Sequence, residues 1–130
     1  MTVALAHLDV QLGDLRAAFP QAQATAQAGG AVLVELPDLA LPAGWNQTHT
    51  TVYFLVPLGY PLSQPDCFWT DGTLRLDTGA MPMNTGVNPL PQMEHLPTLW
   101  FSWHVSAWNP AHDDLLTYTR VIQNRLNQVC

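Results

Sequence analysis

The chain has 130 residues, a formal net charge of −6, and four arginines but no lysine as its basic side chains. So few positive charges cannot follow a phosphate backbone, which argues against binding to nucleic acid and to anionic membranes. The length predicts one domain over residues 1–130, and a hydrophobic content of 48% can build a core without a metal or disulfide. No apolar run is long enough for a membrane span, and the first residues lack the positive flank of a signal peptide, so we expect a cytoplasmic location.

Helical and strand patterns follow one another through the first half of the chain. An apolar stripe at steps of three and four residues predicts a helix over 8–18, which Pro20 ends. The Ala- and Gln-rich stretch 21–28 is expected to add a second helical piece before Gly29-Gly30 breaks it. Composition and turn signals then predict four strands, at 31–36, 48–57, 67–70 and 74–76. The last two strands flank Asp71-Gly72, a dipeptide typical of hairpin turns.

The second half of the chain contains a long loop and a second helix. Residues 81–97 are rich in proline and have no periodicity, which is typical of a functional loop in a compact domain. The apolar run 99–105 is expected to be extended. Asn109-Pro110 is expected to begin the next helix as N-cap and first residue, with Asp113 and Asp114 in the first turn. Apolar residues at helical spacing predict its buried face: Leu115, Tyr118, Ile122 and Leu126.

The order of these elements indicates a fold class. Consecutive strands joined by short turns favour an antiparallel β-meander, and a helix at each end can pack on one face of it. The sequence therefore predicts an α+β fold.

Three local patterns resemble motifs of the ubiquitin-conjugating enzyme superfamily. Residues 59–70, Gly-Tyr-Pro-Leu-Ser-Gln-Pro-Asp-Cys-Phe-Trp-Thr, resemble its Tyr-Pro…Pro-Pro…Phe-x-Thr strand-turn-strand. Residues 81–86 resemble its His-Pro-Asn motif, with a methionine in place of the histidine, and Trp108-Asn109-Pro110 resembles its Trp-Ser-Pro step. Ser102-Trp103-His104 precedes that step, as in the bacterial branch called prokaryotic family E. The chain resembles this family over residues 48–128.

The resemblance implies a fold and a set of partners. The implied fold is ubiquitin-conjugating-enzyme-like: an N-terminal helix, an antiparallel β-meander, a long active-site loop and a C-terminal helix. The implied partners are an adenylating activating enzyme and a ubiquitin-like protein, whose C-terminus this chain would receive and pass on. No cofactor is implied.

The chain departs from the cysteine-dependent members of the superfamily at one position. Their catalytic cysteine lies several residues before the Trp-Pro step, and the corresponding stretch 100–107 contains none here. Cys67 falls in a predicted strand, where packing in the core is its expected role. The role of Cys130 is left open.

Ser102 aligns with the missing cysteine, and His104 lies two residues further on. In an extended segment the two side chains point to the same face. A serine hydroxyl is a weak nucleophile that needs a base, which an imidazole can supply. Ser102 would then carry the acyl group as an oxyester, or His104 would carry it, and the sequence leaves both open. The structural alternative is that Ser102 binds backbone and His104 caps a helix or contacts an aromatic edge.

Asn84 aligns with the asparagine that supports the oxyanion in this superfamily. A turn in a loop rich in proline and glycine would equally explain an asparagine there. A metal site formed by His104, His112 and Asp113 is disfavoured, because these residues lack a metal-ligand spacing. The predicted catalytic residues are therefore Ser102, His104 and Asn84, with no metal.

Two classes of function compete. The first is an acyltransferase that moves a ubiquitin-like protein. The second is a noncatalytic adaptor of the same fold, which binds the ubiquitin-like protein or the activating enzyme, and the missing cysteine fits this class equally well. A third class, an unrelated small hydrolase, would show a Ser–His pair without the meander and its helices.

Overall fold

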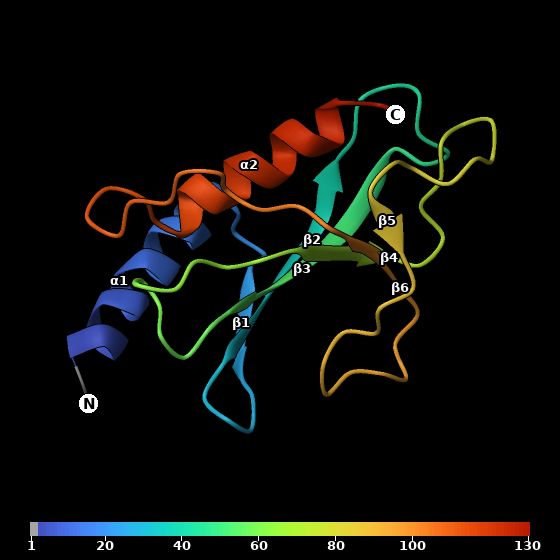
Figure 1. Cartoon of the computed structure of the whole chain (residues 1–130). Coiled ribbons are helices and arrows are strands. Elements are labelled where there is room, and N and C mark those ends of the chain that lie inside the picture. Colours follow the sequence, from blue (N-terminus) through green and yellow to red (C-terminus); the bar gives the residue numbers. More distant parts are fainter. Residues whose placement is uncertain (1–2) are drawn as a thin grey trace.

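The computed structural model describes the backbone of residues 3–130 and the side chains from Leu8 onward. The described elements, shown in Figure 1, are α1 (Val3–Ala18), β1 (Gln23–Ala26), β2 (Val32–Ala40), β3 (His49–Val56), β4 (Phe68–Asp71), β5 (Thr85–Gly86), β6 (Thr98–Phe101) and α2 (Leu115–Asn127). The strands form one sheet of six, in the order β1-β2-β3-β4-β6-β5, and every pairing is antiparallel. The predicted α+β class is confirmed: along the chain, one helix precedes the antiparallel strands and one helix follows them. No helix within residues 3–130 is both long and apolar enough to cross a membrane.

Both helices cover the same face of the sheet (Figure 1), and the main core lies between. The predicted buried faces are confirmed, with α1 contributing Leu8, Leu12 and Leu15, and α2 contributing Leu115, Tyr118, Ile122 and Leu126. Alternate residues of the strands complete this core, because side chains along a strand point to opposite faces: Val34, Leu36, Val52, Phe54, Phe68 and Phe101. Phe68 stacks on Phe101 across the β4–β6 pair, with 4.6 Å between ring centroids.

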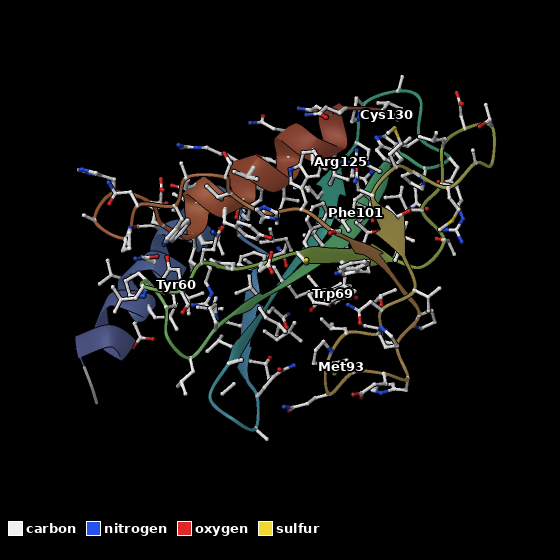
Figure 2. The ribbon with its side chains drawn as sticks, viewed as in Figure 1. Tyr60, Trp69, Met93, Phe101, Arg125 and Cys130 are labelled. Carbon is white, nitrogen blue, oxygen red and sulfur yellow. The ribbon has the colours of Figure 1, made fainter. Side chains whose placement is uncertain are left out.

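The opposite face of the sheet is covered by the second half of the predicted loop. Figure 2 shows Met93 of this loop below the sheet, on the side of Trp69. The cluster there consists of four buried residues, Leu33, Tyr53, Trp69 and Leu90, with Met93, Leu96 and Trp100 partly buried against them. Trp69 Nε1 donates to Asn88 O at 2.6 Å, and the amide of Gln92 both donates to and accepts from the backbone of Ala28. Much of the length of loop 81–97 therefore serves to cover the sheet.

Two of the predicted elements were wrong. No part of the Ala- and Gln-rich stretch 21–28 is helical. Its residues Gln23–Ala26 form β1, which pairs with β2 from Gln23↔Glu35 to Ala26↔Val32. Helix propensity is a weak preference, and backbone pairing with a neighbouring strand overrides it here. Residues 74–76 do not form a strand, because β6 takes the free edge of β4 and leaves Leu76 a single bridge to Trp45.

The boundaries of several predicted elements also differ in the structure. The predicted helix over 8–18 begins at Val3, and β2 continues past Pro37 to Ala40 through a register shift between Leu36 and Leu39. Asp38 takes a positive φ of 55° at that shift. The run 99–105 is regular strand only as far as Phe101. Loop 81–97 contains the two residues of β5.

The second helix begins five residues later than Asn109-Pro110 predicts, with Asp114 as its N-cap. Asp114 Oδ1 accepts from the Thr117 N–H at 2.8 Å, and Thr117 Oγ1 accepts from the Asp114 N–H at 3.1 Å, which is a capping box. Asn109 closes a preceding turn, since its carbonyl accepts from the Asp113 N–H at 2.7 Å. The two aspartates thus precede the helix instead of lying in its first turn.

Replacing Asp114 with alanine is expected to lower the free energy of unfolding by about 1 kcal/mol, because the first turn of α2 loses its cap. Urea denaturation followed by circular dichroism measures the change. Asp77→Ala is the matched control, since Asp77 is exposed and lies outside both helices. Equal losses in the two variants would contradict a capping role.

Candidate functional site

The chain leaves β6 as an extended segment that carries two of the predicted site residues. Its exposure alternates: Phe101 is buried, Ser102 exposed, Trp103 half-buried, His104 exposed and Val105 half-buried. Phe101 and Trp103 belong to the main core or pack against it. Because successive side chains of extended chain point to opposite sides, Ser102 and His104 share the solvent face.

Asn84 immediately precedes β5, the edge strand beside β6, and lies next to Ser102. The Ser102 N–H donates to the Asn84 carbonyl at 2.8 Å, next to the β5–β6 pairing of Thr85 with Phe101. Asn84 has a φ of 61°, which asparagine tolerates better than most residues, and Thr85 Oγ1 donates to Pro82 O at 2.6 Å within the same turn. Asn84 is thus a turn residue, and the turn places it against Ser102. The length of the loop does not separate the two, because its extra residues lie on the other face.

His104 faces a carboxylate that sequence reasoning did not select. Its Nδ1 lies 3.8 Å from Asp66 Oδ1, and both side chains are largely exposed, at 63% and 68%. Ser63 and Gln64 join these two residues around an open hollow of about 410 Å³. The carboxylate and the ring are within ion-pair distance but beyond hydrogen-bond distance, so Asp66 places a negative charge beside the imidazole.

The neighbours of Asp66 and His104 in the chain, Cys67 and Trp103, hold these two side chains near each other. The Cys67 N–H donates to Trp103 O at 2.8 Å, which holds the two segments side by side beyond the β4–β6 ladder. From α2, the buried Tyr118 hydroxyl donates to Cys67 O at 2.7 Å. Burial raises the pKa of Tyr118, so this hydroxyl keeps its proton at neutral pH. No local pattern links residue 66 to residue 104. The only sequence signal for Asp66 is its place within the motif over residues 59–70.

Cys67 is half-buried just before β4, not within a strand and not in the core as predicted, with its Sγ 3.7 Å from Asp66 Oδ1. Burial raises the pKa of the Cys67 thiol, and the neighbouring Asp66 carboxylate raises it further. Since the thiolate is the reactive form, this environment disfavours Cys67 as a nucleophile.

We therefore expect native Cys67 to be alkylated by iodoacetamide more slowly than the unfolded chain at pH 7. A raised pKa means a smaller thiolate fraction, so the native rate should rise with pH along a profile displaced to higher pH. Intact-mass measurement on Cys130→Ser, in buffer and in urea, isolates the Cys67 signal, and Cys67→Ser reports Cys130 separately. A native rate at pH 7 equal to the rate in urea would refute this expectation.

The candidate metal ligands are not brought together. Among the described residues, no group of three or more His, Cys, Asp or Glu side chains is placed to hold a metal ion. Asp113 accepts from the Asn109 N–H at 2.7 Å, and His104 faces Asp66.

Comparison with known proteins identifies a family. A family model described as prokaryotic E2 family E matches residues 21–129, which include all six strands, α2, and the residues of the site. No curated protein and no solved structure matches the chain significantly. E2 proteins work with an activating enzyme to conjugate a ubiquitin-like protein. The match therefore supports a role in the conjugation of a ubiquitin-like protein. The chain belongs to the prokaryotic E2 family E.

Proposed function

We propose that this protein accepts the C-terminus of a ubiquitin-like protein from an activating enzyme, as an oxyester on Ser102, and then transfers it. The observation that carries the proposal is the shared exposed face of Ser102 and His104, with Asp66 3.8 Å from the imidazole. A hydroxyl and a base are the parts that nucleophilic acyl transfer needs, and a carboxylate beside the base would stabilise its protonated form.

The proposed transfer has two steps, loading of Ser102 and then delivery to an acceptor. Ser102 Oγ attacks the carbonyl carbon of the thioester that joins the ubiquitin-like protein to the activating enzyme, while His104 takes the hydroxyl proton. The C–O bond forms, the C–S bond breaks, and the departing thiolate receives the proton. An oxyester is less reactive than a thioester, so this loading step runs downhill. Attack by an acceptor amine then breaks the ester and returns the proton to Ser102.

Two further features support this role. The exposed Asn84 is held against Ser102 by the backbone hydrogen bond, and an amide donor there would stabilise the oxyanion that forms during the transfer. The chain contains no lysine, so none of its own side-chain amines competes for the bound acyl group.

One observation favours the second candidate, a noncatalytic adaptor. Met83 and Val87 lie on either side of Asn84 and β5 with 63% and 92% of their surface exposed. Exposed apolar side chains that lie close together can form part of a binding surface, and such a surface beside Ser102 could hold a ubiquitin-like protein without chemistry.

The deciding experiment mixes the protein with the activating enzyme and the ubiquitin-like protein encoded by neighbouring genes, together with ATP, and records intact masses. An adduct that survives thiol reductant and maps to Ser102 supports the oxyester carrier. An adduct cleaved by mild thiol would point to Cys67 or Cys130 instead. Tight binding to the ubiquitin-like protein with no adduct would establish the adaptor.

A further inference from the structure

Arg125, in the last turn of α2, has only 1% of its surface exposed. Burial of a charge requires compensation, which is normally a carboxylate. Within the described residues its guanidinium has no Asp or Glu partner. It donates instead to the backbone carbonyls of Met83 at 2.7 Å and Gln128 at 2.8 Å, and to the backbone oxygen of Cys130 at 3.1 Å.

The same guanidinium lies over two aromatic rings. Its central carbon is 5.2 Å from the ring centroid of Phe101 and 5.4 Å from that of Trp103, both within the range of a cation–π contact. Figure 2 shows Arg125 between α2 and Phe101, with Cys130 close by at the end of the chain.

These contacts converge on the two segments that form the proposed site. Met83 immediately precedes Asn84, and its own N–H donates to Cys130 O at 3.2 Å. Phe101 and Trp103 are the two residues on either side of Ser102. Arg125 therefore contacts the chain on both sides of the Asn84–Ser102 hydrogen bond. It binds the carbonyl of Met83, which precedes Asn84, and it packs on the rings of Phe101 and Trp103, which flank Ser102.

We propose that Arg125 is a positioning residue that fixes Asn84 against Ser102 for acyl transfer. Its consequence for catalysis rests on the proposed function, whereas its effect on the Asn84–Ser102 contact does not. Arginine suits this position because a planar guanidinium can stack on rings while its forked N–H groups reach carbonyls in different directions. A lysine ammonium has the charge but lacks the plane and the fork.

The structural half of the proposal is tested by amide hydrogen exchange on the full chain. In Arg125→Met and Arg125→Lys, exchange of the Ser102 amide should accelerate on the order of tenfold, as loss of one hydrogen bond's worth of local stability implies. The Leu41 amide, which donates to Thr48 O at 2.8 Å in the β2–β3 hairpin, serves as the internal reference and should not change. Arg120→Met is the matched control, because Arg120 is exposed on the same helix.

The catalytic half is tested by the rate of adduct formation with the same neighbouring activating enzyme, ubiquitin-like protein and ATP. Displacement of Asn84 from Ser102 should slow loading by about 10²-fold in both Arg125 variants, with the Kd for the ubiquitin-like protein unchanged. A variant that was only destabilised would recover its rate at lower temperature and would show faster exchange at Leu41 as well.

The outcomes separate the two proposals. Unchanged Ser102 exchange in Arg125→Met overturns the positioning role, and so does a loss of loading no greater than in Arg120→Met. If Arg125→Met does not fold, the Arg125→Lys variant tests the proposal instead. A Ser102 amide that exchanges at the wild-type rate in that variant overturns the positioning role. If the wild-type protein forms no adduct, the proposed function fails, while Ser102 exchange still decides whether Arg125 positions this contact.

Discussion

Ser102→Ala is expected to abolish the covalent adduct with the ubiquitin-like protein, and Ser102→Cys to restore one that mild thiol cleaves. Alanine removes the only atom at this position that can form an ester, so the adduct should vanish instead of forming slowly. Cysteine places a stronger nucleophile on the same backbone and converts the product to a thioester. Ser102 is exposed and its N–H, not its hydroxyl, bonds Asn84, so neither substitution removes the described backbone contact.

The control for this experiment is Ser106→Ala, which removes an exposed serine four residues further along the same segment. It should load at the wild-type rate. Persistence of a full adduct in Ser102→Ala would remove Ser102 from the role of nucleophile. If that adduct mapped to His104, the histidine would be the acyl carrier, which is the alternative that the sequence leaves open.

Loss of the imidazole in His104→Gln is expected to slow adduct formation by about 10²- to 10⁴-fold, the usual contribution of a positioned general base. The amide of glutamine cannot take the hydroxyl proton, although its size gives the hollow beside Asp66 a similar lining. Single-turnover loading followed by intact mass measures the rate directly. Because His104 is exposed, the midpoint of urea unfolding should remain close to that of the wild type.

His112→Gln is the matched control, since His112 is also exposed and lies outside the site. Asp66→Asn should produce a smaller loss than His104→Gln, because it keeps the size of the side chain and removes only the negative charge beside the imidazolium. A loading rate unaffected by His104→Gln would show that the base is elsewhere. A loss as large in His112→Gln would show that the effect is not specific to the site.

Local patterns in the sequence determined the class of fold and led to the three predicted site residues. The buried stripes of both helices follow from periodicity, and the strand over 48–57 follows from its composition. Both signals act over a few residues and need no knowledge of the rest of the chain. The face shared by Ser102 and His104 also follows from the period of extended chain. Asn84 followed from a motif, and the structure places its carbonyl 2.8 Å from the Ser102 amide.

Only the tertiary structure decided what surrounds those residues. The stretch that became β1 has helix-forming composition, and its pairing with β2 required a partner strand that no local pattern specifies. Asp66 is about forty positions from His104, and Arg125 is 42 positions from Met83, so these contacts depend on the register of β4 against β6 and on the docking of α2. Such long-range contacts depend on packing and pairing over the whole sheet, whereas sequence periodicity reports only which side of an element faces the core.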